Sequence, residues 1–170
     1  MIEKPTPNEY KAYYGNYIGL VPDGNVLEIL SNQNEVIANL LGEISEEKSI
    51  YRYAENKWSI REVVGHIIDT ERIFAYRALR ISRNDKAVLA GFEQDDYVPN
   101  SNHNNILIKN LAEEFSLVRK ANIKLFETFT DEMWLRTGTA SGSTVSVRAA
   151  VYVIAGHPIH HINVLKEKYL

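Results

Sequence analysis

Cysteine is absent from this chain of 170 residues. Its absence excludes disulfide bonds, thiolate metal ligands and a cysteine nucleophile, although it does not by itself fix the cellular compartment. Any thiol chemistry at this protein would therefore need a thiol supplied by another molecule.

A strong excess of charge of either sign is also missing. The chain has 19 lysine and arginine residues against 22 aspartate and glutamate residues, a formal net charge of -3. The densest basic group consists of Arg77, Arg80 and Arg83, which we interpret as a solvated face of a helix. This charge balance predicts no nucleic-acid partner.

Long apolar runs are lacking too. No stretch reaches the ~18 uninterrupted apolar residues of a membrane span. The first residues, "MIEKPTPNEY", lack the apolar core of a signal peptide. We therefore expect a cytoplasmic protein without a membrane partner. The length suits one well-buried core, so residues 1–170 are predicted to form a single domain.

No window alternates with period two for long enough to predict a strand, whereas helical spacing of apolar residues is frequent. It occurs over residues 26–44, 58–82, 107–129 and 147–165. Ser59 and Glu62 form a capping box at the start of the second segment. A tyrosine-rich lead-in, residues 1–22, precedes the first segment, and the breaker-rich "TGTASGST" precedes the fourth. The fold predicted is an all-α four-helix bundle.

The connection between the second and third predicted helices, residues 84–102, is unusually long. Extended at roughly 3.3 Å per residue, such a segment can run the whole length of a helix that rises ~1.5 Å per residue. The two helices are therefore predicted to be parallel, with this segment as a crossover and a candidate lid. Asp95 and Tyr97 within it either line the mouth of a site or belong to an exposed loop.

Three histidines lie within "AGHPIHHINVL", residues 155–165. On a helical wheel, His157 and His161 face the apolar side, and His160 turns toward water. Such an i, i+4 pair can hold one ion from a single helix face. His66, beside the apolar stripe of the second predicted helix, is the third candidate ligand. Three neutral histidines at Zn–N distances of about 2.0 to 2.1 Å would leave a coordination position for water or substrate.

Each of these features also has an ordinary structural explanation. A single histidine such as His66 is more often a packed core residue, and an i, i+4 histidine pair often arises by chance. Pro158 removes a hydrogen bond to the carbonyl of Ile154 and should kink the helix between the two ligands, which either aims His157 at the ion or spoils the site.

Four other side chains have mainly structural interpretations. His103 is predicted to be exposed at a helix start. For Asp69 we prefer the interpretation as a surface charge to that as a hydrogen-bond partner of a metal ligand. Trp58 and Trp134 are predicted to close the ends of the bundle. The sequence contains no Glu-x-x-His, H-E-x-x-H or G-x-S-x-G motif and no phosphate-binding glycine loop. If the protein is an enzyme, a metal is therefore the expected chemical centre.

Three stretches together resemble the DinB/YfiT-like superfamily. They are "KWSIREVVGHIIDTERIFAYRALRISRND", "LAGFEQDDYV" and "VSVRAAVYVIAGHPIHHINVLKEKYL". The resemblance rests on a histidine early in the second helix, a GF-x-x-D segment between helices and a C-terminal GH-x-x-HH, and it extends from about "YIGLVP" to the C-terminus. It implies a four-helix bundle with a long crossover and a divalent ion, commonly zinc or nickel, bound by His66, His157 and His161. Pro158 departs from the family, whose members often have a helix-compatible residue there.

The resemblance implies a thiol S-transferase that uses a low-molecular-weight thiol of the bacillithiol type and an electrophilic small molecule. A metal-dependent hydrolase and a non-catalytic metal-binding stress-response protein are the alternatives. Because family members are often dimers, a homodimer is a further expectation. No residue is assigned as general base or cofactor-binding group.

Overall fold

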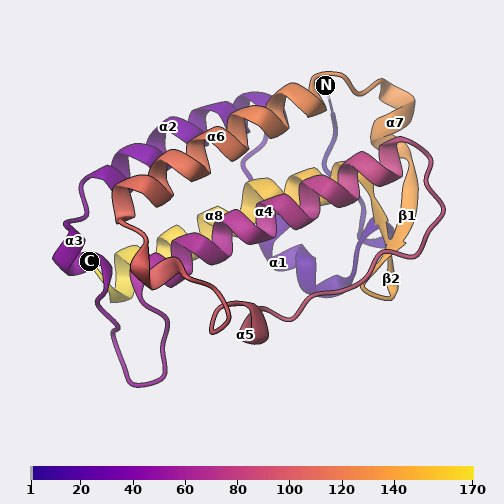
Figure 1. Cartoon of the computed structure of the whole chain (residues 1–170). Coiled ribbons are helices and arrows are strands. Elements are labelled where there is room, and N and C mark those ends of the chain that lie inside the picture. The colour runs from indigo at the N-terminus through magenta and orange to yellow at the C-terminus, as the bar shows by residue number, and fades with distance from the viewer. Residues whose placement is uncertain (1) are drawn as a thin grey trace.

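Four long helices form the body of the protein in the computed structural model, which describes residues 2–170 (Figure 1). They are α2 (Val26–Gly42), α4 (Ile60–Ser82), α6 (Ile108–Phe126) and α8 (Val147–Lys168). The predicted four-helix bundle is confirmed. Within the described part of the chain, no helix is both long enough and apolar enough to cross a membrane.

Short elements connect or flank these helices. They are η1 (Pro7–Glu9), η2 (Ala12–Tyr14), α1 (Gly15–Ile18), α3 (Glu46–Ser49), α5 (Gln94–Tyr97), η3 (His103–Asn105), α7 (Asp131–Leu135), β1 (Thr137–Ala140) and β2 (Ser143–Ser146). The predicted lead-in, residues 1–22, therefore contains η1, η2 and α1, and α1 packs directly against α8.

Polar side chains define where the long helices begin. Ser59 accepts a hydrogen bond from the backbone N–H of Glu62, whose carboxylate accepts one from the backbone N–H of Ser59, so the predicted capping box is confirmed. Asn25 caps α2, and Ser146 caps α8 through the N–H of Ala149. These caps satisfy backbone donors that a helix leaves unpaired in its first turn.

Helices α4 and α6 run in the same direction, as the chain colours in Figure 1 show. The connection between them leaves the far end of α4, passes through α5 and η3, and returns to the end where α4 begins. The predicted parallel arrangement with a crossover is therefore present. Helices α2 and α8 run in the opposite direction (Figure 1).

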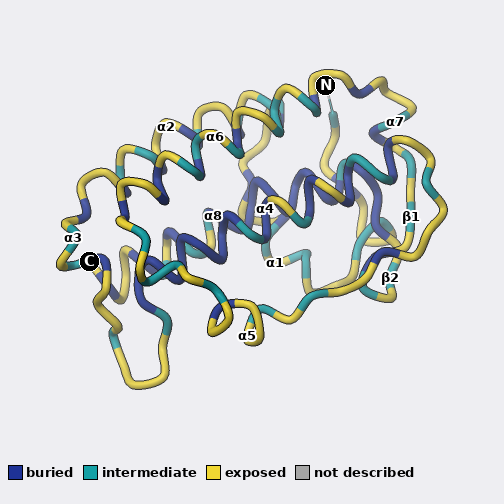
Figure 2. Tube along the Cα trace, viewed as in Figure 1, coloured by how far each residue is buried: buried dark blue, intermediate teal, exposed yellow. Residues whose placement is uncertain are grey.

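Buried residues are most frequent along α4 and α8 (Figure 2). The buried apolar residues form two clusters separated by a polar layer. On α8, the first cluster ends at Ala155 and the second begins at Ile162. On α4, the second cluster ends at Ile68 and the first begins at Phe74. The buried polar residues His66, Thr70, Glu71, Arg119 and His157 belong to neither cluster. Buried polar groups require partners, so this layer is where a functional site is expected.

The expectation of a protein without strands is wrong. Strands β1 and β2 form an antiparallel hairpin whose register pairs Ala140 with Ser143. The two loop residues, Ser141 and Gly142, have φ values of 51° and 72°, which suit a two-residue hairpin turn. Leu89 of the crossover adds a parallel bridge to Ala140. Residues that break helices in "TGTASGST" therefore form a tight turn rather than an irregular loop.

The interpretation of the arginine row as a solvated face is correct for Arg83 and wrong for Arg77. Arg83 is exposed, whereas Arg77 is buried. The Arg77 guanidinium donates to the Ala90 carbonyl and the Ser141 hydroxyl at 3.0 and 2.8 Å and lies over the Phe74 ring. Arg77 thus ties the crossover and the hairpin to α4.

An ion pair joins the N-terminal segment to the start of α8. Arg148 donates from Nε and Nη2 to the two carboxylate oxygens of Glu9 at 2.8 and 2.6 Å, and Ser146 donates to the same carboxylate at 2.7 Å. Although burial by itself raises the pKa of Glu9, the hydrogen bonds from Arg148, Thr6 and Ser146 outweigh it and lower the pKa to about 2.

Because the folded-state pKa of Glu9 lies below its ordinary value, this carboxylate stabilises the fold fully above about pH 5. The contribution is lost as the pH falls toward 2. We expect Glu9→Gln to lower the free energy of unfolding at pH 7 by about 1 to 3 kcal/mol. The difference between variant and wild type should shrink between pH 5 and pH 2, as urea unfolding would measure. A difference that is constant over this range would contradict the assignment.

Candidate metal centre

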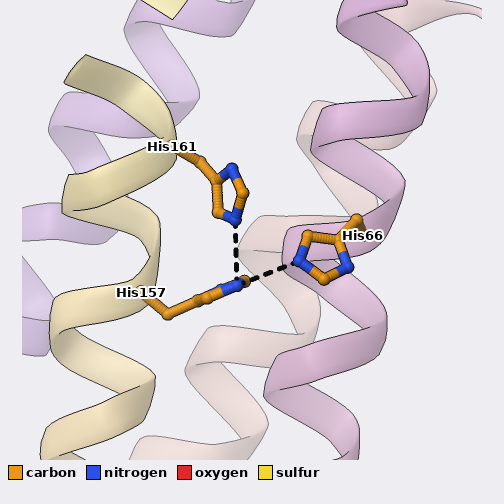
Figure 3. Close-up of side chains that lie close together, drawn as sticks. All are labelled: His66, His157 and His161. Carbon is orange, nitrogen blue, oxygen red and sulfur yellow. Dashed lines mark hydrogen bonds between the residues drawn. The ribbon is translucent and has the colours of Figure 1, made fainter. Parts of the chain in front are cut away.

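Three histidines from two helices converge inside the polar layer (Figure 3). His66 lies on α4, and His157 and His161 lie one turn apart on α8. The exposed fractions of His66 and His157 are 3% and 4%, and His161 is partly buried. The capping box fixes the first turn of α4 and therefore the direction in which His66 points. All three residues predicted as ligands are brought together.

The nitrogen atoms of these rings are close enough to share one ion. The Nε2 atom of His157 lies 3.0 Å from the Nε2 atoms of both His66 and His161 (Figure 3). One ligand atom from each histidine lies within 4.8 Å of the others. Zn–N bonds of about 2.0 to 2.1 Å place two nitrogens roughly 2.9 Å apart at a right angle and roughly 3.3 Å apart in a tetrahedron. The two 3.0 Å spacings at His157 lie between these values.

Hydrogen bonding alone does not account for both contacts of His157. A ring nitrogen carries either one proton or one lone pair in the ring plane, so His157 Nε2 can form one good hydrogen bond of this kind, not two. A cation placed among the three lone pairs removes the conflict. The donor set therefore fits a divalent ion such as zinc or nickel, both of which imidazole nitrogen suits.

Burial keeps these histidines neutral, which is the form that binds metal. Burial, followed by the charge of His103, lowers the pKa of His66 to about 4. Burial and the neighbouring histidines lower the pKa of His161 to about 3 and that of His157 well below its usual range. At neutral pH the site therefore presents three lone pairs.

Aromatic rings enclose the histidines from two sides. Trp58, which was predicted to close an end of the bundle, packs its ring on His66 with centroids 5.0 Å apart. Tyr17 packs edge-on against His157 at 5.1 Å. His160 is exposed, as predicted, and its ring lies 5.5 Å from that of Tyr17. Trp134 lies on α7 and packs on Phe129 within the first apolar cluster.

His103 was expected to be exposed, and this expectation is wrong. Only 12% of its side chain is exposed, and its ring lies against Gly65, where a Cβ atom would overlap it. Its Nε2 atom lies 3.9 Å from a carboxylate oxygen of half-buried Asp69. Gly65 therefore allows η3 to pack against α4 next to His66.

Pro158 does not interrupt α8, which runs from Val147 to Lys168. Because Pro158 has no backbone N–H, the Ile154 carbonyl lacks its usual donor. It accepts a hydrogen bond from Arg119 instead, at 3.4 Å. Arg119 of α6 is fully buried and forms an ion pair with Glu71 of α4 at 2.8 Å. A buried side chain from α6 thus accommodates the proline between His157 and His161 on α8.

Gly156, the residue before His157, lets α1 approach α8. A Cβ atom at this position would overlap the backbone carbonyl of Tyr17. We expect Gly156→Ala to displace α1 and to lower the free energy of unfolding by about 1 to 3 kcal/mol. Gly42→Ala in α2 is the matched control, since nothing lies within 4 Å of its new Cβ atom. Thermal unfolding of both variants would test this, and equal melting temperatures would contradict it.

Two clefts are lined by different members of the histidine group. The first, about 760 Å³, is lined by His66 and His157 together with Tyr17, Thr70, Phe74 and crossover residues 88–94. The second, about 660 Å³, is lined by His160, His161, Trp58 and Asp95 among others. Asp95 thus lines the mouth of a cleft that reaches His161. Tyr97 does not line either of these two clefts.

Sequence reasoning missed Tyr17, Thr70 and the role of Trp58. The position of Thr70, four residues after His66 on the same helix face, was the available signal for that residue. Tyr17 and Trp58 approach through loops and a short helix, for which periodicity gives no direction.

Comparisons with known proteins agree with this architecture. Residues 29–165 match the family model described as the DinB superfamily. The fold is similar to that of YfiT from Bacillus subtilis, with a TM-score of 0.72 and 15% identity over 97% of this chain and 90% of that one. That protein is described as "a probable metal-dependent hydrolase with an unusual four-helix bundle topology". A DinB-like protein from Bacillus subtilis, YjoA, has a TM-score of 0.61 and 22% identity over 85% and 88% of the two chains. No curated protein matches the chain.

Proposed function

The chain belongs to the DinB superfamily, and from this premise we propose that it is a metal-dependent thiol S-transferase acting on electrophilic small molecules. In this proposal, His66, His157 and His161 hold one divalent ion, zinc or nickel. The convergence of their nitrogens supports the metal, because two 3.0 Å contacts meet at one atom of His157.

We choose a transfer reaction because two clefts are lined by the histidines of the same centre. His66 and His157 line the first cleft, and His161 lines the second. A transferase brings two organic reactants to the same point, whereas water needs no cleft of its own. Because the chain has no cysteine, the thiol enters as a low-molecular-weight co-substrate.

The residues of the chain have separate tasks in this reaction. A bound divalent ion would supply one property, a lowered pKa of a thiol or water. The three histidines stay neutral because burial lowers the pKa of each of them, and in this form they would hold the ion. Tyr17 and Trp58 pack on the ligand rings and limit their rotation. The two clefts orient the reactants toward each other.

A metal-dependent hydrolase is the second candidate. The similarity in fold to YfiT, described as a probable metal-dependent hydrolase, favours it. In that reaction water would take the place of the thiol, and one cleft would suffice for the substrate.

Turnover of an electrophile by zinc- or nickel-loaded protein, with and without added cysteine-derived thiol, separates these candidates. A thioether product formed only with the thiol supports the transferase. Hydrolysis without the thiol supports the hydrolase. A protein that holds its ion but accelerates neither reaction across a panel of electrophiles would contradict both and indicate a non-catalytic metal-binding role.

Two bulky substitutions test the assignment of one reactant to each cleft. Val88 is exposed and lines the first cleft, and Val164 lines the second. We expect Val88→Trp and Val164→Trp to raise the KM of different reactants. A transferase whose two variants raise the KM of the same reactant would contradict the two-cleft arrangement.

A further inference from the structure

Along α4, the wall of the first cleft changes from polar to apolar with distance from His66. His66, Thr70 and Phe74 lie at i, i+4 and i+8 on α4, and all three line this cleft. Consecutive members of such a row are roughly 6 Å apart along the helix axis. Thr70 therefore lies one turn from the metal ligand, and Phe74 lies one turn farther, with Val153 of α8 also lining this cleft.

The hydroxyl group of Thr70 has no partner within residues 2–170. Its Oγ1 atom is buried, and the residue is 3% exposed. A helical threonine commonly donates to a carbonyl one turn earlier, which would satisfy the hydroxyl. Here that bond is not formed. A buried polar group without a partner is unfavourable, so this hydroxyl is suited to a ligand that enters the cleft.

Away from the histidines and the ion that they are proposed to hold, charge contributes little to the first cleft. Apart from its histidines and tyrosines, the titratable side chains that line it are Lys11 and Glu93, which are exposed and opposite in sign. The remaining wall includes Tyr14, Phe74 and Phe92. An uncharged molecule with an apolar or aromatic body fits this lining better than an ion does.

We propose that the first cleft binds uncharged α,β-unsaturated carbonyl compounds with an apolar body, and that Thr70 donates a hydrogen bond to their carbonyl oxygen. This inference rests on the proposed transferase function. The thiol sulfur forms a bond to the β carbon, and the π electrons of the carbon–carbon double bond move toward the carbonyl oxygen. The proton released by the thiol ends on the α carbon, so the addition needs neither a leaving group nor an oxidant.

The position of Thr70 suits this reaction because negative charge grows on the carbonyl oxygen as sulfur adds. A hydroxyl donor one helical turn from His66 would stabilise that charge. Thr70 acts in this account as a positioning and specificity-determining residue. It is not a metal ligand, so its replacement should leave the ion in place.

Equilibrium binding of benzylacetone, an unreactive saturated ketone, tests the hydrogen bond directly. We expect Thr70→Val to weaken its binding about tenfold, as loss of one neutral hydrogen bond predicts. Thr70→Ser should restore the affinity of the wild type. Butylbenzene, which lacks the carbonyl group, should bind wild type and Thr70→Val equally. Equal binding of benzylacetone by Thr70→Val and wild type would overturn the inference.

Addition of a thiol to benzylideneacetone, the corresponding unsaturated ketone, separates this inference from the proposed function. If wild type catalyses the addition, Thr70→Val should lower kcat/KM for the ketone at unchanged metal content and thiol KM. If wild type binds benzylacetone through Thr70 but catalyses no addition, the hydrogen bond stands and the transferase proposal fails. Addition at equal rates by wild type and Thr70→Val would overturn the role of Thr70 and leave the transferase proposal standing.

Discussion

Replacing His157 by alanine is expected to abolish metal binding. The Nε2 atom of His157 lies 3.0 Å from the Nε2 atoms of both His66 and His161. Its loss removes the central one of the three proposed ligand atoms. Loss of groups that merely orient a ligand costs about 10- to 100-fold in metal affinity. We therefore expect at least that loss for His157→Ala, measured as metal content by mass spectrometry and by competition with a chelator.

His160→Ala is the matched control for this experiment. It removes an imidazole from the same helix, one residue from His161, but its ring is exposed and lies outside the triad. It should retain about one ion per chain, like the wild type. Equal metal content in His157→Ala and His160→Ala, with both proteins folded by circular dichroism, would contradict the assignment of the ligands.

Replacing Arg119 by methionine is expected to lower the free energy of unfolding by about 3 to 5 kcal/mol, because it leaves the buried charge of Glu71 unpaired. Both side chains are nearly inaccessible, with exposed fractions of 0% and 2%. The Nε and Nη2 atoms of Arg119 donate to the two carboxylate oxygens of Glu71 at 2.8 Å each. The same substitution removes the donor to the Ile154 carbonyl beside Pro158.

Lys124→Met on the same helix removes an equal charge from an exposed ion pair with Glu127. Exposed pairs contribute about 0 to 1 kcal/mol, so this variant should unfold almost as wild type does. Adding Glu71→Gln to Arg119→Met removes the orphaned charge and should recover part of the lost stability. Urea unfolding of these three variants measures the effect, and equal stability of Arg119→Met and Lys124→Met would contradict it.

The parts of this structure that could be predicted follow from periodicity within single helices. The apolar stripes located the four long helices, and Ser59 with Glu62 located the start of α4. The helical wheel placed His157 and His161 on the same side of α8 and His160 toward water. These predictions depend on local geometry, which the spacing of residues along one helix determines.

The features that could not be predicted depend on contacts between distant segments. Arg77 is buried because the crossover and the hairpin cover it, and His103 is buried because η3 packs on Gly65. Each strand of the hairpin has four residues, which are too few for an alternating apolar pattern to be recognised. Arg119 supports the turn at Pro158 from another helix, so the sequence around Pro158 gives no sign of how the proline is accommodated.

X-ray absorption spectroscopy at the edge of the bound metal tests the central claim most directly. The account predicts scattering from three imidazole rings with nitrogen atoms at about 2.0 to 2.1 Å, and fewer rings in a His161→Ala sample that still holds metal. A spectrum that is best described by oxygen ligands alone, or that is the same in wild type and His161→Ala, would show that the ion binds elsewhere and would contradict the account.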